Sequence, residues 1–401
     1  MNLGVLTKDL ETAEQEFITI WGSEHTWFLD LFKLVNEIRR VYGIKITDVL
    51  IRAGKPIYFG ILKNFFTLKQ IIGSSNKIDL NQFKRFTETK GKLSLLDIKS
   101  FVEKYVTYKF AEKREIKHLN FSLNIYGLGC YRINYSENDE GVSLNIRVLD
   151  FEIPSLGSIL PKNQYAQRYM DFFNKLIETK EITFERQSVE IGKVKRGGLI
   201  LHAGPTGSGK TTFIAAELLH FVNNIAGLLI TYEDPIEYRF TDYPKVLQIE
   251  LETNLKEEEV VKHFLRNSPS IGMFHEVKTR EQFENVIDLA SRGHLVFTTV
   301  HANDVGEVFS SFSTLDKNFR QLFSQVLLAI VCHKLDLGNK GEIVPLLEVF
   351  FNDAVYVGGD AAKSRAIFTL FLDQDIIKLR NLLYAEKKYE FFWTFQDFKR
   401  F

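Results

Sequence analysis

The run GPTGSGKTT, residues 204–212, constrains the fold of this chain more than any other part of its sequence. It directly follows the apolar segment LILHA and precedes FIAAELLHFV, which has the composition of a helix. A phosphate-binding loop needs glycines that let backbone N–H groups approach the phosphates, a lysine that reaches the β and γ phosphates, and a hydroxyl for Mg²⁺. Gly204, Gly209, Lys210 and Thr211 supply these groups in that order. The run therefore predicts an α/β domain that binds ATP, or another nucleoside triphosphate, with Mg²⁺.

The alternative for this run is a glycine-rich surface turn without a ligand. With glycine at about 7% of residues, chance produces this spacing in roughly a few per cent of chains of this length, and the flanking strand and helix are those that the motif requires. We therefore predict that the whole run contacts the nucleotide. The predicted contact residues are Gly204, Pro205, Thr206, Gly207, Ser208, Gly209, Lys210, Thr211 and Thr212.

The segments after residue 198 alternate between short apolar runs and helical patterns. Strands are expected in LILHA, LLITYED, SIGMF and HLVFTTV, and helices over residues 210–224 and 280–291 and in the tail. This alternation is typical of a mainly parallel sheet with crossover helices, the α/β class.

The first 155 residues have a different pattern. Residues 26–40 carry apolar side chains at three- and four-residue spacings, as in a one-sided helix, and strands are expected in FSLNIYG, CYRINYS and VSLNIRVLDFEI. Pro154 and the following SLGSILPKN have the composition of a linker. We predict an α+β domain over residues 1–155, a linker over 156–165, and an α/β domain with a helical tail over 166–401.

A candidate catalytic carboxylate, Glu276, lies in the segment SIGMFHEVKT. A zinc protease motif is excluded, because position 279, four after His275, is a threonine where a second histidine is required. In a phosphate-binding α/β sheet, a strand beside the loop ends near the γ-phosphate, and a carboxylate at its tip can polarise the attacking water. We predict this role for Glu276. A solvated carboxylate at a strand end is the alternative.

Two further segments place polar groups after expected strands. In TYEDPIEY, Glu233 and Glu237 could orient the nucleophile, and Glu233 could join Thr211 in holding Mg²⁺ through water. In GHLVFTTVHAND, His301 follows the strand and could donate to a phosphate and report its loss. The alternative for His301 is a structural histidine with its hydrogen bonds satisfied.

Composition excludes several other classes. The chain has 51 basic and 51 acidic residues, so no overall field attracts it to nucleic acid, and no nucleic-acid partner is expected. Its two cysteines are far apart, which argues against a disulfide framework or a cysteine zinc site. No apolar run approaches the ~20 residues that span a bilayer, and the first residues lack the pattern of a signal peptide. We expect a cytoplasmic protein.

Together these segments resemble a known family, the hexameric secretion and pilus motor ATPases of the PilT and GspE type. The resemblance is carried by GLILHAGPTGSGKTT, by ITYEDPIEY as the aspartate box and by GHLVFTTVHAND as the histidine box, and more weakly by ITDVLIRAGKP, YRIN, RVLDFEIPS and GEIVPLLEVFFNDAV. It implies an N-terminal PAS-like domain, a C-terminal RecA-like domain, and a ring of six subunits. It also implies a place at the inner membrane, beside the platform protein of a pilus or secretion machine.

Within that family the chain is most similar to the pilus retraction branch, which is short and lacks a four-cysteine zinc element. A short type IV secretion ATPase is the alternative. The chain also departs from the family, because residues 351–364 do not match the helical motif AIRNLIREGK expected after the last strand, and His275 and Lys278 replace a glycine and an arginine. The family uses arginines of its N-terminal domain near the phosphates. The resemblance implies this role for Arg132 and Arg147, while Cys130 replaces a further arginine.

Three hypotheses for function follow. The first is an ATP-hydrolysing motor, with Glu276 activating water, that drives a pilus or secretion machine. The second is an ATP-binding accessory subunit with little hydrolysis, in a mixed ring beside an active paralogue. The third, a RecA-like nucleic-acid translocase, is disfavoured by the neutral net charge and by the absence of a clear basic, aromatic-rich groove in the sequence.

Overall fold

The computed structural model divides the chain into two compact units, Met1–Glu152 and Ile153–Phe401. The residues that it describes are 15, 17–61, 64–73, 78, 83, 86, 92–110, 116–125, 129–149, 152–160, 163–184, 187–251, 255, 257–337, 343–352, 361–384 and 392–395.

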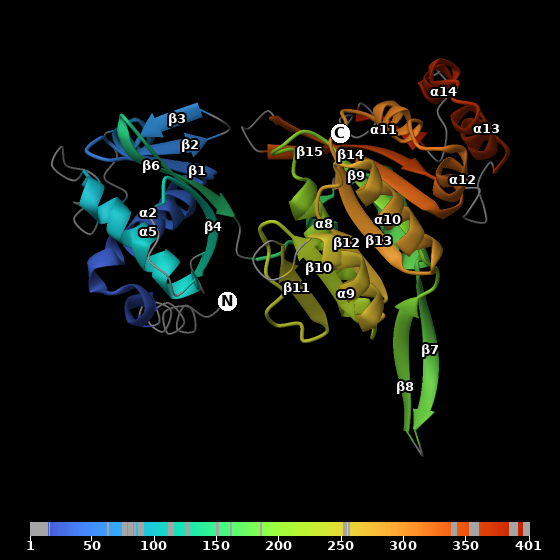
Figure 1. Cartoon of the computed structure of the whole chain (residues 1–401), viewed down its shortest axis with the longest axis horizontal. Helices are drawn as coiled ribbons and strands as arrows, with labels where there is room; N and C mark the ends of the chain where they lie inside the picture. Colours follow the sequence, from blue (N-terminus) through green and yellow to red (C-terminus); the bar gives the residue numbers. More distant parts are fainter. Residues whose placement is uncertain are drawn as a thin grey trace. The chain divides into compact units, whose positions relative to one another are not determined.

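The first unit is a six-stranded antiparallel sheet with helices, in the strand order β3-β2-β1-β6-β5-β4 (Figure 1). Its strands are β1 (Asp48–Arg52), β2 (Tyr58–Ile61), β3 (Asn64–Thr67), β4 (His118–Ile125), β5 (Gly129–Asn138) and β6 (Gly141–Leu149). Its helices are η1 (Ser23–His25), α2 (Thr26–Tyr42), α3 (Leu68–Ile72) and α5 (Leu95–Phe110). The α+β prediction for this region is confirmed.

Helix α2 forms where the apolar periodicity predicts it, and it buries one face in the core of the first unit. It ends at Gly43, whose φ of 68° is the left-handed conformation that glycine adopts without steric cost. The buried face is aromatic: Phe28 stacks on Phe101 of α5, with 4.7 Å between ring centroids, and Phe32 lies against Tyr131 of β5. The helix and the sheet therefore share one core.

The second unit is an eight-stranded sheet in the order β11-β10-β12-β13-β9-β14-β15-β16. The strands from β11 to β14 are parallel to their neighbours, and β15 and β16 are antiparallel additions. Its strands are β9 (Gly198–Ala203), β10 (Leu229–Glu233), β11 (Val246–Glu250), β12 (Ile271–Phe274), β13 (Leu295–Val300), β14 (Leu327–Leu337), β15 (Ile343–Phe351) and β16 (Phe392–Trp393). The predicted α/β class is confirmed, with β9 at the centre of the sheet.

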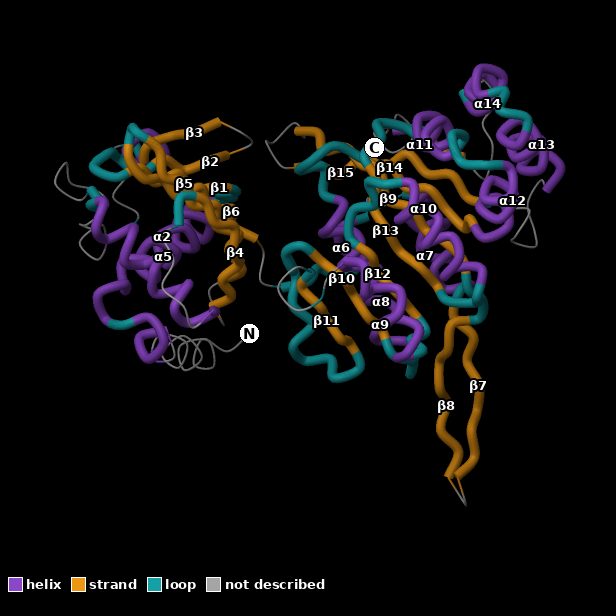
Figure 2. Tube along the Cα trace, in the orientation of Figure 1, coloured by secondary structure: helices purple, strands orange, loops and turns teal. Residues whose placement is uncertain are grey.

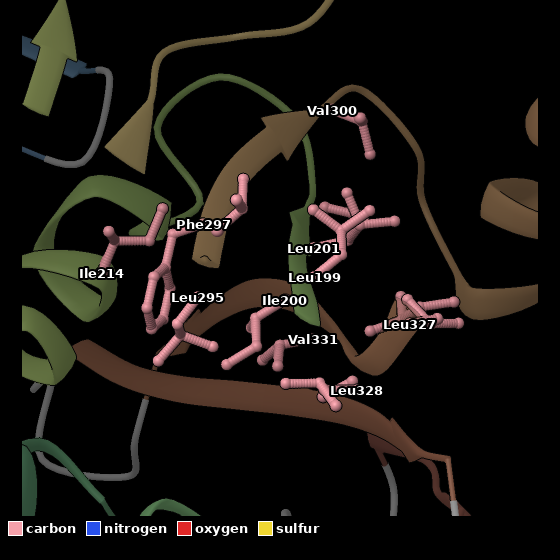
Figure 3. Packing of buried hydrophobic residues seen from close by; sticks show 14 of the residues in the cluster. Leu199, Ile200, Leu201, Ile214, Leu295, Phe297, Val300, Leu327, Leu328 and Val331 are labelled. Carbon is pink, nitrogen blue, oxygen red and sulfur yellow. The ribbon is translucent and has the colours of Figure 1, made fainter. Parts of the chain in front are cut away.

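Helices pack on this sheet through an almost wholly apolar core. They are α6 (Leu156–Ile159), α7 (Gln164–Lys175), α8 (Lys210–Asn224), η3 (Glu257–Glu259), α9 (Val260–Asn267), α10 (Arg280–Ser291), α11 (Val305–Phe312), α12 (Lys317–Val326), α13 (Ala361–Leu372) and α14 (Ile376–Leu383). Figure 3 shows side chains of the central strands, among them Ile200 and Phe297, close to Ile214 of α8. The ranges of α8 and α10 agree with the predicted helices over 210–224 and 280–291.

Residues 156–165 differ from the predicted linker. They include α6 and the start of α7, and Leu156, Leu160 and Tyr165 are buried in the core of the second unit. The turn-forming residues that suggested a linker are interspersed with apolar side chains, and these side chains find buried partners in other segments of the second unit. Residues 353–360, most of the segment in which the family's helical motif has no match, lie outside the described residues.

Strands β7 (Ile177–Phe184) and β8 (Gln187–Val194) form a hairpin that extends away from the rest of the second unit (Figures 1 and 2). Its base is fixed to the C-terminal end of α8, because the Ala226 N–H donates to the Gly192 carbonyl at 2.8 Å. Gly192 leaves no room for a side chain, since a Cβ there would lie 1.7 Å from the Asn224 carbonyl oxygen. The sequence patterns gave no indication of this hairpin. In the part of the chain that the structure describes, no helix is long and apolar enough to cross a membrane.

Candidate nucleotide-binding site

The glycine-rich run forms the turn between β9 and α8, with Lys210 as the first residue of the helix. Gly204, Gly207 and Gly209 have φ values of 148°, 78° and 91°, which L side chains rarely adopt. A Cβ at Gly204 would also lie 2.8 Å from the carbonyl oxygen of His333 on β14. Because the loop leads into a helix N-terminus, its backbone N–H groups and the helix dipole favour a bound anion.

The remaining residues of the run differ in exposure. Pro205, Thr206 and Gly207 are exposed at the apex of the loop, and Ser208 is buried beneath it. Thr211 and Thr212 are half-buried in the first turn of α8, and the Thr212 hydroxyl is 2.9 Å from the hydroxyl of Tyr238. The backbone of residues 205–207 is therefore exposed, and the hydroxyl groups of Thr211 and Thr212 follow it in the first turn of the helix.

The Lys210 ammonium folds back over the loop. It donates to the Gly204 carbonyl at 2.5 Å and to the Pro205 carbonyl at 3.1 Å. Burial lowers the pKa of Lys210, and the nearby carboxylates of Glu276 and Glu237 partly offset this effect. The two carboxylates predicted at different strand ends thus both act on the lysine of the loop.

Glu276 lies two residues beyond the end of β12 and contacts two basic side chains. Its Oε1 is 2.7 Å from Nε2 of His301, and its Oε2 is 3.4 Å from Nζ of Lys278. The other ring nitrogen of His301, Nδ1, lies 3.3 Å from the Gly204 carbonyl oxygen. Adjacent parallel strands bring these residues together, because β12 pairs with β13 and β13 pairs with β9. We call Lys210, Glu276 and His301 the strand-end cluster.

Glu233, the last residue of β10, points into the protein. It accepts from the Thr231 hydroxyl at 2.6 Å and from the Gln248 amide at 3.1 Å. Burial raises the pKa of Glu233 to about 7, although both hydrogen bonds act to lower it. Glu233 and Thr211 line the same small cavity, together with Tyr238 and Met273. The accessible lining of this cavity is apolar and the Glu233 carboxylate is engaged by two hydrogen bonds, so the role of Thr211 and Glu233 in holding Mg²⁺ stays a prediction.

Glu237 and His275 flank the strand-end cluster. Burial lowers the pKa of His275, and the carboxylates of Asp234, Glu237 and Glu276 partly offset this effect. The backbone N–H of His275 donates to the Tyr232 carbonyl at 2.8 Å, and its carbonyl accepts from Thr298 at 3.2 Å. His275 is therefore fixed between neighbouring strands, beside the predicted catalytic carboxylate.

Arg132 and Arg147 lie in the first unit, on β5 and β6. They are directly opposite in the antiparallel register, so their side chains are neighbours on one face of the sheet. Arg147 also contacts Asp48 on β1, with 3.4 Å between Nε and Oδ1. The structure thus brings the two arginines together, and their action at the nucleotide stays a prediction.

Sequence reasoning missed two sets of residues in the second unit. The first is a buried polar group beneath the loop, for which the only sequence signal is His202 and Glu217 inside otherwise apolar runs. The second is a bidentate pair in which Arg380 of α14 donates to Asp304 at 3.0 Å, three residues after His301. The sequence around that arginine, Arg380-Asn381-Leu382, repeats the RNL of the motif that was expected earlier in the tail.

The strand, glycine-rich loop and helix define the second unit as an α/β domain of the P-loop class. The sequence model of a family described as Type II/IV secretion system protein matches residues 138–344, more than half of the 401 residues. The chain belongs to this family, and the resemblance seen in its sequence is confirmed.

Two of the relatives with assigned names are pilus proteins of Pseudomonas aeruginosa. The chain is 28% identical to "Type IV pilus ATPase PilU" over 49% of this chain and 45% of the relative. It is 28% identical to "Type IV pilus retractation ATPase PilT" over 55% of this chain and 59% of the relative. The chain thus matches only about half of the length of these relatives.

Solved structures with the same fold cover nearly the whole chain. The pilus retraction motor PilT with bound ADP has a TM-score of 0.63 at 22% identity, over 91% of this chain and 95% of the motor. The Legionella pneumophila ATPase DotB has a TM-score of 0.56 at 16% identity, over 92% of this chain and 90% of that protein. These similarities confirm the two-part fold that the sequence predicted.

Proposed function

We propose that this chain binds ATP with Mg²⁺ and hydrolyses it, as the motor of a type IV pilus or a related secretion machine. The observation that carries the proposal is the strand-end cluster, in which Lys210 and His301 both contact the Gly204 carbonyl and His301 also contacts the predicted catalytic carboxylate of Glu276. Membership of the secretion family and the names of the relatives support it.

The chemistry follows from the positions of the side chains. Loop N–H groups and Lys210 bind the phosphates, and Glu276 orients and polarises the attacking water. His301 contacts both Glu276 and the loop, so it can transmit a change at the γ-phosphate to the strand end. Thr211 and Glu233 would hold Mg²⁺, which supplies charge neutralisation at the phosphates when bound. The two arginines of the first unit, Arg132 and Arg147, would add positive charge at the phosphates.

The assembly belongs to the same proposal. We propose a ring of six copies, or a mixed ring with a paralogue, that works from the cytoplasm against an inner-membrane platform protein. Movement between the two units during hydrolysis would provide the force. Pilus retraction is the first candidate for the output, because PilU and PilT are among the relatives and the fold of the retraction motor covers this chain almost completely. A type IV secretion ATPase is the alternative, supported by the match to the Type II/IV secretion system protein family.

Steady-state ATP hydrolysis by the full chain tests the proposal, with oligomeric mass recorded in the same samples. Glu276→Gln should keep nucleotide binding and lower turnover by roughly 10² or more, the usual contribution of a general base. Lys210→Ala should lose binding. Glu284→Gln is the matched control, because that carboxylate only pairs with Arg280 on the surface of α10. If Glu276→Gln hydrolysed ATP at the wild-type rate, the assigned role of this glutamate would be wrong.

A second candidate is an ATP-binding subunit with low turnover. It is favoured by the ion pair between Lys278 and Glu276, which engages the second oxygen of the carboxylate that must meet water. Nucleotide binding by the wild type without turnover would support this candidate, and a several-fold gain of turnover in Lys278→Ala would identify the ion pair as the cause. Robust turnover by the isolated wild type would exclude it.

A further inference from the structure

Four polar side chains are buried together directly beneath the phosphate-binding loop. They come from four elements: Tyr169 of α7, His202 of β9, Glu217 of α8 and His333 of β14. None of them is more than 1% exposed. Burying a carboxylate and two imidazoles in an apolar core is costly unless they are paired, so this group requires a physical explanation.

The four side chains form one continuous chain of contacts, which we call the buried chain. The Tyr169 hydroxyl donates to Oε1 of Glu217. Nε2 of His202 lies 2.9 Å from Oε2 of the same carboxylate. On the other side of the ring, Nδ1 of His202 lies 2.9 Å from Nε2 of His333. His202 therefore has one ring nitrogen close to the carboxylate of a helix and the other close to a second imidazole on a neighbouring strand.

The number of protons in the buried chain is restricted. Of the two facing nitrogens of His202 and His333, one must donate and the other accept. Burial, the charge of His202 and the charge of Lys210 lower the pKa of His333 well below its usual value, so His333 is the neutral ring. His220, also on α8, is a further titratable neighbour of Glu217. A further proton on His333 would set two donors face to face and break the chain.

The buried chain holds both ends of the phosphate-binding loop. His202 lies two residues before Gly204 on the strand that enters the loop, and Glu217 lies on the helix that leaves it. The carbonyl oxygen of His333 and the hydroxyl of Ser208 together close the space beside Gly204, since a Cβ there would lie 2.8 Å and 2.6 Å from these two atoms. The Gly204 carbonyl in turn contacts Lys210 and His301. Displacement of β9, α8 or β14 would therefore move the Gly204 carbonyl, which Lys210 and His301 contact.

We propose that His202, Glu217 and His333 are positioning residues for the phosphate-binding loop, and that the buried chain holds Gly204 and the first turn of α8 in the conformation that binds nucleotide phosphates. This inference rests on the proposed binding of ATP at the loop. The contrasting explanation is that these residues only contribute to folding. The two explanations differ in what an apolar replacement of the whole group would do.

A variant with all four groups replaced, Tyr169→Phe, His202→Leu, Glu217→Met and His333→Leu, leaves no polar atom of the chain unpaired. Apolar residues of similar volume in place of a buried ion pair are often neutral or stabilising. We expect this variant to unfold at or near the wild-type temperature and to bind a fluorescent ATP analogue with Mg²⁺ about tenfold more weakly, the effect of about one hydrogen-bond energy. Wild-type affinity in the folded variant would overturn the inference.

A conservative variant decides the question if the apolar variant does not fold. Glu217→Gln keeps the shape and the contact with Tyr169 but removes the charge that faces His202. Its affinity for the analogue should be several-fold weaker than that of wild type at pH 8. Equal affinity of this variant and wild type would contradict the inference.

Asn352→Leu is the control for a loss of buried polar contacts away from the loop. Asn352 donates to the carbonyl of Leu327, at the start of β14, and to that of Ser324. This control should unfold at a lower temperature and bind the analogue with wild-type affinity. If wild type itself does not bind the analogue, the proposed function fails together with the inference. If wild type and the apolar variant bind equally well, the inference alone fails.

Discussion

The strand-end cluster and the buried chain both meet Gly204, but they differ in exposure to water. In the strand-end cluster, the side chain of His301 is 50% exposed and that of Glu276 is 16% exposed. In the buried chain, His202 and Glu217 are completely buried. Both clusters contain a histidine within 3 Å of a glutamate. The same pair of residue types thus occurs in two different environments around one glycine.

The difference in exposure indicates what the His301–Glu276 pair and the His202–Glu217 pair can each do. A pair that reaches water contributes at most about 1 kcal/mol to stability and can exchange its partners, which suits a group that must meet substrate and water. A fully buried pair costs several kcal/mol to break, so it can hold its surroundings in one arrangement. We infer that the exposed histidine serves the reaction cycle and that the buried one serves the geometry of the loop.

The largest effect that distinguishes the two pairs is on stability. Glu217→Leu should destabilise the second unit by about 3 to 5 kcal/mol, because it leaves buried polar partners unpaired, whereas His301→Ala should cost less than about 1 kcal/mol. Hydrogen exchange of the amides in β9 and α8, read by mass spectrometry, measures this unit separately from the first. Equal protection in the two variants would remove the distinction between the clusters.

A smaller effect should appear on changing the pH. The pKa of His333 is lowered in the folded protein, so its contribution to stability is complete above its usual pKa near 6.5 and is lost as the pH falls below that value. Glu233, with a raised pKa, acts in the opposite direction, since its contribution is lost as the pH rises towards 7. Protection of β9 in a Glu233→Gln background should therefore decrease from pH 7 to pH 5.5. Constant or increasing protection would show that His333 does not titrate in this way.

The smallest expected effect concerns the tail helix α14. Arg380→Ala removes the bidentate contact with Asp304, whose carboxylate also caps α11. Because this pair is partly exposed, we expect about 1 kcal/mol less protection of α11 and a change of less than about twofold in nucleotide affinity. Lys378→Ala, on the exposed face of the same helix, is the control. A tenfold loss of affinity would instead place the tail helix in the machinery of the strand-end cluster.

The segments predicted best were those in which the local signals for a helix or turn agree with the packing of the same residues in the core. Apolar periodicity and the glycine-rich run gave the ranges of α8 and α10, because helix formers, caps and glycines with positive φ act within a few residues. The predicted linker was wrong because local sequence and tertiary structure disagree there. Turn-forming residues over 156–165 suggested a loop, but Leu156 and Leu160 find buried partners that lie elsewhere in the chain.

The sequence by itself determined the P-loop class, the family and the candidate residues, because each motif is contiguous and its chemistry requires fixed residue types at fixed spacing. Only the tertiary structure decided which of those residues meet. Gly204, Glu276 and His301 come from three separate segments, and they converge because β12, β13 and β9 are adjacent parallel strands. The buried chain depends on two helices and two strands whose arrangement no local pattern encodes, since non-local contacts are set by the packing of the whole core.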